Sequence, residues 1–483
     1  MQAFNPYLPS WEYIPDGEPH VFGDRVYVYG SHDRFNAPIF CMNDYVCWSA
    51  PVNDLSDWTC SGTIFRKNQD PMNKLGLRLL FAPDAAQGPD GRFYLYYAFD
   101  FMGAIGVAVC DTPDGQYQFY GHVHYADGTL LGRRKGDDFP FDPGVLVDDD
   151  DQVYLYSGFA TKVPFILSGF HDLSNNGGSV VVLDRDMVTI RREPKLLFPR
   201  RGLPGGWKDH EFFEASSIRK IDGKYVFVYS SANNHELCYA VSDKPDEGFV
   251  YGGTLVDQGD LYMDGRTDEA HARNYLGNTH GGMAELNGQW YIFYHRQTNQ
   301  HSYSRQACAE PLERTANGGF KQAEVTSCGL NGGPLAGIGR YEARIACNLW
   351  AKEGTGRYDA SSPRRRFAAH PYFTQSGKDR DSNGDQYIAN MRDGAVAGFK
   401  YFDITDANAI RIEVNGKASG HMEVASDADF THIAARIKVD SQLEQSICCE
   451  EAAFELPAGK TALYFRFVGD GALNFHAFEL LRH

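Results

Sequence analysis

Four side chains that are able to exchange protons lie at related places in the sequence: Asp16, Asp142, Glu214 and His280. Two carboxyl groups placed on opposite sides of a bond can hydrolyse it, because one donates a proton to the leaving group while the other activates a water molecule. Carboxylates are costly inside an apolar core unless they are paired, so their convergence indicates a functional site. The residue types therefore predict an active site built from carboxyl groups and an imidazole.

The elements that position these residues are revealed by an internal repeat. Five segments share a tight Asp/Asn/Gly-rich turn followed by an aromatic-rich run: GDRVYVYGSHD (23–33), DGRFYLYYAFD (90–100), DDQVYLYSGFA (150–160), DGKYVFVYSSA (222–232) and NGQWYIFYHRQ (287–297). When the segments are aligned on their turns, the equivalent residues lie 67, 60, 72 and 65 positions apart: Tyr27, Tyr94, Tyr154, Val226 and Tyr291. Each segment is typical of a hairpin, and several copies add a third β-run. One unit is therefore about four strands in ~66 residues.

Units of this kind favour an all-β fold, a five-bladed β-propeller over residues 1–330. A four-stranded unit cannot cover both of its faces alone, and radial repetition solves this problem. A linear array of β-sandwiches with accidental spacing is the alternative. In a propeller the innermost strand of each blade lines the central axis, so the leading residues of these strands converge there.

The axial positions are found by counting back eleven or twelve residues from each aligned position. The count reaches Asp16, Pro83 with Asp84 beside it, Asp142, Glu214 and His280. Each residue also has a structural interpretation: Asp16 and Asp142 stand in turn sequences, Glu214 could be a paired structural residue, and His280 could be a loop histidine. The shared offset favours a common site over independent coincidences.

The composition limits the partners of the chain. With 46 Lys and Arg against 63 Asp and Glu, the 483 residues have a net charge of −17. This charge repels phosphate backbones and anionic lipids, so we expect neither nucleic acid nor a membrane as a partner, whereas an uncharged ligand is unaffected. The sequence does not indicate an oligomeric state.

Cysteine usage and the N-terminal segment predict a cytoplasmic location. The ten cysteines form no CxxC pair, and several stand in apolar runs, which is typical of reduced, buried thiols. The segment MQAFNPYLPSWEYIPDGEPHVF lacks the basic and apolar regions of a signal peptide. A secreted protein is the alternative, if a leader has been removed.

Five stretches of the chain together resemble family-43 glycoside hydrolases over about residues 5–325. They are NPYLP…PDGEPHVFGDRVYVYGSHD, FAPDAAQGPDGRFYLYY, FDPGVLVDDDDQVYLY, EASSIRKIDGKYVFVYSS and HGGMAELNGQWYIFYHR. Each fragment is a weak signal alone, and the set is specific. That family consists of five-bladed propellers that act with inversion, mainly on α-L-arabinofuranosides and β-D-xylosides.

The resemblance implies a role for each of the site residues. Asp16 is expected to be the general base, Glu214 the general acid, and Asp142 the residue that orients the acid and tunes its pKa. Arg305 resembles an arginine that contacts sugar hydroxyls in some members. His280 falls where the family places an axial histidine, near a bound water or a calcium ion.

Two further points concern the residues that surround these five. The family usually has Asp-Pro at its first motif, whereas this chain has Asp16-Gly17-Glu18-Pro19, so Glu18 is an alternative base. The offset to the aligned position favours Asp16. We also expect Asp84 and Phe213, which lie beside axial positions, to contact the substrate.

Inverting hydrolysis sets requirements on the two catalytic carboxyl groups, which should lie ~6.5–9.5 Å apart. Glu214 must be protonated near neutral pH, and burial beside Phe212 and Phe213 and the charge of Asp142 would both raise its pKa. Asp16 must be ionised, so we expect it to be more exposed to solvent than Glu214. No cofactor is required in this scheme, although a neutral His280 could take one position around a mostly hydrated Ca²⁺.

The character of the chain changes after residue 330. Residues 331–483 contain short alternating strands and a final segment, GDGALNFHAFELLRH, that weakly resembles the last strand of jelly-roll carbohydrate-binding modules. We expect a C-terminal β-sandwich that is accessory or binds carbohydrate.

The expected function follows from the site and the resemblance together. It is an inverting exo-glycosidase that removes terminal α-L-arabinofuranosyl residues from plant-derived oligo- or polysaccharides, with carbohydrate as its partner. The alternatives are a β-D-xylosidase or β-D-galactofuranosidase of the same fold, and a non-catalytic sugar-binding propeller.

Overall fold

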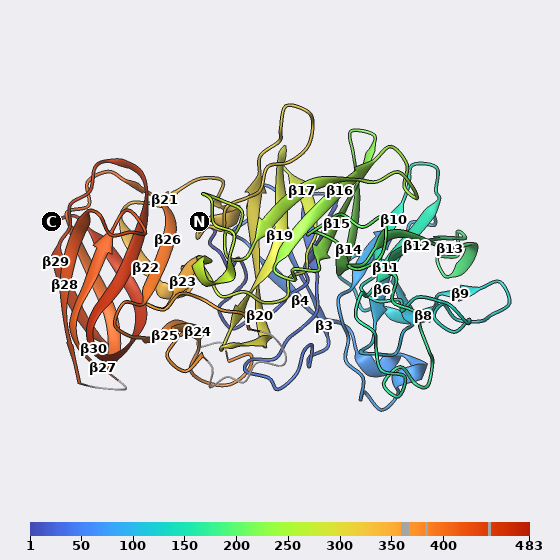
Figure 1. The fold of residues 1–483 in the computed structure, drawn as a ribbon, viewed down its shortest axis with the longest axis horizontal. Coiled ribbons are helices and arrows are strands. Elements are labelled where there is room, and N and C mark those ends of the chain that lie inside the picture. Colours follow the sequence, from blue (N-terminus) through green and yellow to red (C-terminus); the bar gives the residue numbers. More distant parts are fainter. Residues whose placement is uncertain (359–366, 382–384, 443–445) are drawn as a thin grey trace.

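The computed structural model describes residues 1–358, 367–381, 385–442 and 446–483. A β-propeller, blue to olive in Figure 1, lies beside a C-terminal β-sandwich, orange to red. This confirms the predicted fold class. Within the described residues, no helix has the length and apolar character needed to cross a membrane.

Five sheets surround the propeller axis, and neighbouring strands within them are antiparallel except for the pair β13 and β9. The first blade contains β1 (Glu18–Phe22), β2 (Arg25–Tyr29), β3 (Tyr45–Pro51) and β4 (Thr59–Phe65). The second contains β5 (Asp84–Gln87), β6 (Phe93–Ala98), β7 (Ile105–Cys110) and β8 (Gln118–His122). The third contains β9 (His124–Tyr125), β10 (Gly144–Val147), β11 (Val153–Gly158), β12 (Gly177–Leu183) and β13 (Thr189–Pro199). The fourth contains β14 (Phe212–Ile221), β15 (Lys224–Ser231), β16 (Glu236–Ser242) and β17 (Val250–Asp257), and the fifth β18 (Met283–Leu286), β19 (Gln289–Thr298) and β20 (His301–Leu312).

Alternation along the second strand of each blade explains why the ring packs. Successive side chains of a strand point to opposite faces. In β2, Val26 and Val28 therefore pack against the fifth blade, whereas Tyr27 and Tyr29 pack against the second. Equivalent clusters lie between the three remaining pairs of neighbouring blades. Each aromatic-rich run is therefore buried on both faces.

The fifth blade has three strands, where the repeat predicted four, and the N-terminal segment lies against its outer strand. The backbone N–H of Tyr7 donates to the carbonyl of Ala307 at 3.3 Å. The amide of Asn5 donates to the carbonyl of Ala309 at 2.8 Å and accepts from its N–H at 3.0 Å. The first residues of the chain thereby close the ring.

The described residues of the C-terminal sandwich form ten strands. They are β21 (Leu335–Ala336), β22 (Gly339–Glu342), β23 (Asn348–Trp350), β24 (Tyr372–Thr374), β25 (Tyr387–Met391), β26 (Val396–Ile404), β27 (Ala409–Ala425), β28 (Ile433–Ser441), β29 (Cys448–Ala453) and β30 (Gly459–Leu481). The prediction of short strands is wrong for β27 and β30, which have 17 and 23 residues. Their paired glycines Gly420 and Gly469 have φ of 152° and 153°, and a Cβ on either would collide with the facing backbone. Glycine therefore allows the two strands to continue through this close approach.

Two segments of the C-terminal region lie on the propeller. Tyr358 donates its N–H to the carbonyl of Leu276 at 2.7 Å, and the carbonyl of Phe373 accepts from the N–H of Asn299 at 2.9 Å. The last propeller strand ends at Leu312 and the first sandwich strand begins at Leu335. The division at residue 330 stays a prediction.

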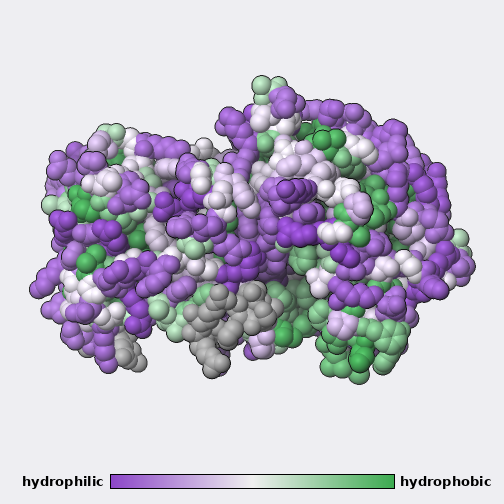
Figure 2. Space-filling view, in the orientation of Figure 1, coloured by the Kyte–Doolittle hydropathy of each residue, from purple (hydrophilic) through white to green (hydrophobic). Residues whose placement is uncertain are grey.

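The surface agrees with the acidic, polar composition. Figure 2 shows a largely hydrophilic face, with a hydrophobic area at the lower right. That area lies in the part of the view where η1 (Lys67–Gln69) and η2 (Pro71–Asn73) lie in Figure 1. Leu75 and Leu77, which follow η2, are exposed.

Candidate active site

A pocket of about 270 Å³ contains the residues expected at the propeller axis. Seven of its 18 lining residues are phenylalanines: Phe40, Phe81, Phe101, Phe139, Phe141, Phe159 and Phe213. Its charged residues are Asp16, Asp100, Asp142, Glu214, His280, Arg305 and Arg357. Flat apolar rings beside a few charged groups suit a ligand that has both C–H faces and hydroxyl groups, such as a sugar.

The four proton-exchanging residues reach the pocket from the beginnings of inner strands. Asp16 and Asp142 precede β1 and β10, Glu214 lies near the start of β14, and His280 precedes β18. Asp16 and Asp142 have positive φ, 59° and 45°. Aspartate tolerates this left-handed conformation better than most residues, which is the local reason for this residue type at both chain turns.

Asp16 is held as a carboxylate by a charge partner. Burial raises the pKa of this carboxyl group, but Arg305, whose Nη1 lies 2.9 Å from Oδ1, acts together with His295, His280 and Ser31 to lower the net pKa. We expected Asp16 to be the wetter of the two catalytic carboxyls. The structure contradicts this, because Asp16 is only 4% exposed whereas Glu214 is half-buried. The guanidinium replaces water as the source of stabilisation.

Glu214 has the opposite electrostatic environment. Burial and the nearby charge of Asp142 raise its pKa well above the usual value. Asp142 is itself buried, which raises its own pKa, and its Oδ2 accepts the N–H of Ala215 at 3.2 Å. One carboxyl group of the pocket thus favours the charged form and another favours the protonated form, which is the pattern of an acid–base pair.

His280 is paired with Asp142 and does not match its predicted state. Its Nδ1 lies 3.4 Å from Asp142 Oδ2. Burial lowers the pKa of the imidazole, but Asp142, Asp16 and Glu18 together outweigh burial and raise it to about 9. The prediction of a neutral imidazole is therefore wrong, because the ring is protonated near neutral pH.

The side chains near His280 do not form a calcium site by themselves. Calcium takes six to eight oxygen ligands, and the Nδ1 of His280 is already paired with Asp142. In the described part of the chain, two groups have the spacing of metal ligands, Glu18–His20–Asp84 and His210–Glu236–Cys238, and neither includes His280. A calcium ion beside His280 stays a prediction that depends on water as the other ligands.

Arg305 links the site to a residue that the sequence did not single out. Its Nε and Nη2 donate to Asp33 at 2.8 and 3.0 Å, while Nη1 donates to Asp16. Its guanidinium also lies 4.8 Å from the ring centroid of Phe40. A fork held between two carboxylates has little freedom, so Arg305 can orient Asp16 and present a fixed charge to a ligand.

Two of the predicted site residues lie outside the pocket. Glu18 is buried behind the pocket. Its Oε1 accepts hydrogen bonds from Ser217 and, at 3.0 Å, from Arg219. Burial raises the pKa of the Glu18 carboxyl group. Asp84 bonds His20 at 2.6 Å and the N–H of Val145 at 2.6 Å. Both residues lie on inner strands with their carboxylates used in blade-to-blade contacts, so neither is placed to touch a substrate. Phe213, in contrast, lines the pocket.

Comparison with known proteins decides the family. The sequence profile described as "Glycosyl hydrolases family 43" matches residues 14–320. This chain is a family-43 glycoside hydrolase. It is 48% identical over 486 residues to a xylosidase/arabinosidase from Thermoclostridium stercorarium, with 99% of both chains covered.

Solved structures of family-43 enzymes share the architecture. A family-43 arabinoxylan arabinofuranohydrolase from Bacillus subtilis, in complex with cellotetraose, matches 99% of this chain and 97% of its own with a TM-score of 0.51 at 21% identity, which shows the common fold. A β-xylosidase/α-arabinofuranosidase from a compost metagenome, in complex with xylotriose and in a calcium-free form, matches 67% of this chain and 98% of its own, with a TM-score of 0.50 and 26% identity. As a member of family 43, the chain is an inverting glycoside hydrolase.

Among the pocket residues of this family-43 enzyme that the sequence analysis missed, Asn234 and Arg357 were missed for different reasons. Asn234 stands in the turn between β15 and β16, and its sequence, SSANNHE, is that of an ordinary turn. Arg357 comes from the C-terminal region, outside the repeat, and no periodicity in the sequence connects it to the axis. Only the folded chain brings it to the propeller.

Proposed function

We propose that this family-43 enzyme acts as an exo-glycosidase that removes terminal α-L-arabinofuranosyl residues from plant-derived oligo- or polysaccharides. The observation that supports this proposal is the pocket at the propeller axis, where Asp16, Asp142 and Glu214 meet. Its volume of about 270 Å³ is at the lower end of the ~300–1,000 Å³ usual for small-molecule sites. Such a pocket suits the end of a chain better than its middle.

β-D-Xylosidase is the second candidate, and the names of relatives support it equally. The relative from Thermoclostridium stercorarium is described by both activities, and the compost-metagenome enzyme is described as bound to xylotriose. The two terminal sugars are uncharged pentoses of equal composition, so the same phenylalanine walls can accept either. A purely sugar-binding role is less consistent with this pocket, because binding alone does not require carboxyl groups of opposite pKa shift.

We assign the steps of hydrolysis as follows. The protonated carboxyl of Glu214 gives its proton to the glycosidic oxygen as the bond to the anomeric carbon breaks. A water molecule attacks that carbon from the opposite face and passes a proton to Asp16. Asp142 raises the pKa of Glu214, and Arg305 holds Asp16 in its ionised form.

The test is a comparison of kcat/KM on the nitrophenyl derivatives of α-L-arabinofuranose, β-D-xylose and β-D-galactofuranose. We expect the arabinofuranoside to be cleaved best and the xyloside next. A clear preference for the xyloside would favour the second candidate. Activity confined to the galactofuranoside, or no activity on either pentoside, would contradict the proposal. The variant Glu214→Gln, assayed on a natural disaccharide, controls for contaminating glycosidases.

A further inference from the structure

A short segment of the C-terminal region forms part of the pocket wall. The chain leaves the sandwich at the end of β23, and residues 351–358, here called the arm, lie against the propeller loop that precedes β18. The N–H of Leu276 donates to the carbonyl of Gly356 at 3.1 Å, and the N–H of Tyr358 donates to the carbonyl of Leu276 at 2.7 Å. These bonds stand on either side of Arg357, which lines the pocket.

Arg357 is more exposed than Asp16 and Asp142 and, like Glu214, is only partly buried. Its side chain is 22% exposed, compared with 5% for those of Asp16 and Asp142. Its Nη2 donates to Glu269, and its Nη1 makes a long contact of 3.5 Å to the carbonyl of Asn234. A guanidinium has five N–H donors, so in the described part of the chain three of them have no protein acceptor.

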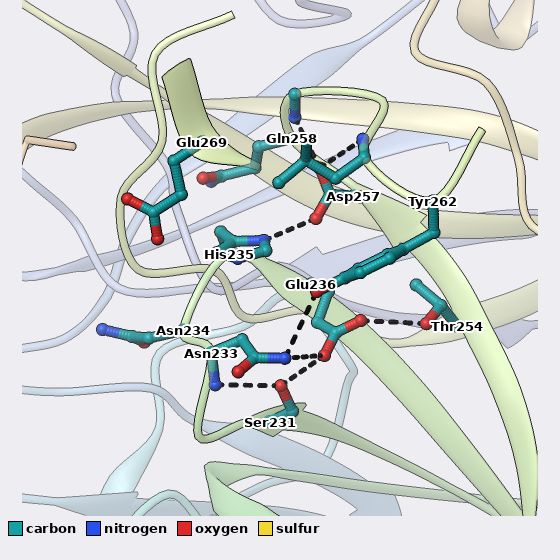
Figure 3. Close-up of polar contacts among 12 residues, drawn as sticks. Ser231, Asn233, Asn234, His235, Glu236, Thr254, Asp257, Gln258, Tyr262 and Glu269 are labelled. Carbon is teal, nitrogen blue, oxygen red and sulfur yellow. Dashed lines mark hydrogen bonds and ion pairs between the residues drawn. The ribbon is translucent and has the colours of Figure 1, made fainter. Parts of the chain in front are cut away.

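Asn234 provides a complementary acceptor at the same place. It has a left-handed backbone with φ of 57°, and its side-chain Oδ1 is buried without a hydrogen-bond partner among the described residues. Figure 3 shows its side chain extending away from the network of Ser231, Asn233 and Glu236, toward the side on which Glu269 lies. A buried amide oxygen without a donor indicates a missing partner, because such a group is costly to leave unpaired.

These two side chains supply what a sugar hydroxyl requires, since a hydroxyl both donates and accepts. A terminal sugar must reach the deeply buried Asp16 and Asp142, so the more exposed residues of the pocket meet the next sugar of the chain. We propose that Arg357 and Asn234 bind the hydroxyl groups of the sugar on the leaving-group side of the bond. The C-terminal sandwich then contributes a binding residue to the active site. This inference rests on the proposed exo-glycosidase function.

A structural bridge is the alternative role for Arg357. Its ion pair with Glu269 ties the arm to the loop before β18. The two roles differ in substrate dependence: a binding residue for the leaving-group sugar is needed only when that sugar is present, whereas a bridge affects stability and all substrates alike.

The experiment compares a nitrophenyl pentoside with an unlabelled oligosaccharide carrying the same terminal pentose. We expect Arg357→Ala to lower kcat/KM on the oligosaccharide by ~10–100-fold, the size of hydrogen bonds to a charged group, chiefly through KM. On the nitrophenyl pentoside the loss should stay below ~3-fold. Asn234→Gly, which keeps the left-handed backbone without strain, should show the same selectivity with a smaller loss.

A matched control removes a different arginine that ties the C-terminal region to the propeller. Arg380 bonds Glu12 at 2.9 Å and lies outside the pocket. Arg380→Ala should lower the unfolding temperature. Its effect on kcat/KM should be the same for the two substrates. If Arg357→Ala and Asn234→Gly lower kcat/KM equally on both substrates, or leave kcat/KM on the oligosaccharide unchanged, the inference is overturned. If the unaltered enzyme cleaves neither substrate, the proposed function has failed instead.

Discussion

At the scale of single residues, the site separates the pKa values of its carboxyl groups by placing charges unequally. Arg305, with help from His295, His280 and Ser31, offsets the effect of burial at Asp16 and lowers its pKa, whereas Asp142 adds to burial at Glu214 and raises its pKa. The enzyme should be active between these two values, because the base must be ionised and the acid protonated. The basic limb of the pH profile then reports Glu214.

Asp142→Asn tests this arrangement. Removing the neighbouring negative charge should lower the pKa of Glu214, so activity should be lost at a lower pH and the basic limb of log kcat/KM should move toward acid. The measurement is a pH series on a nitrophenyl pentoside. Asp100→Asn is the matched control, because Asp100 lines the same pocket and is not among the groups that shift Glu214. An unmoved basic limb in Asp142→Asn would remove Asp142 from the tuning role.

The sequence predicted the members of the site better than their surroundings. The offset within the repeat brought Asp16, Asp142, Glu214 and His280 to one pocket because it follows backbone geometry. Protonation states depend on partners from other blades, such as Arg305 beside Asp16, and these partners are set by tertiary contacts. The sequence analysis therefore mispredicted the solvent exposure of Asp16 and the charge of His280.

At the scale of elements, ring closure depends on a segment with no strand of its own. Asn5 is buried, and its side chain bonds the backbone of Ala309 in both directions, Glu310 at 2.8 Å and the carbonyl of Thr326 at 3.1 Å. The repeat shows five aromatic runs but does not show how the last blade is completed. The local sequence pattern therefore predicts the strands, whereas the closure of the ring depends on contacts between segments that are far apart in the sequence.

Asn5→Ala should destabilise the propeller more than an ordinary polar truncation. It leaves several buried backbone and side-chain groups without partners, each of which costs ~1–3 kcal/mol. We expect a decrease of at least ~3 kcal/mol in the free energy of unfolding, measured with a chemical denaturant. Asn317→Ala, at an exposed turn, is the control and should change little. Equal stability of the two variants would show that the N-terminal segment does not close the ring.

At the scale of the whole molecule, propeller and sandwich share buried contacts. Tyr275 of the propeller stacks on Tyr358 of the arm with ring centroids 4.9 Å apart. A buried ion pair also joins the two parts: Lys400 Nζ lies 2.9 Å from Asp260 Oδ2, with side chains 3% and 1% exposed. Such an interface makes the sandwich a structural part of the enzyme rather than a tethered module.

Lys400→Met tests this coupling, because it removes the buried positive charge and leaves Asp260 without its ionic partner. Breaking a buried pair in this way typically costs ~3–5 kcal/mol, so we expect a loss of that size in the free energy of unfolding. The double variant Lys400→Met/Asp260→Asn removes both charges and should recover much of the stability, since the amide oxygen can still accept the N–H of Val325. Lys352→Met is the matched control: Lys352 pairs with Asp393 within the sandwich, both side chains are exposed, at 64% and 46%, and the change should be small. If Lys400→Met is no more harmful than Lys352→Met, the buried ion pair does not couple the two parts, and their other contacts, such as those of the arm, must do so.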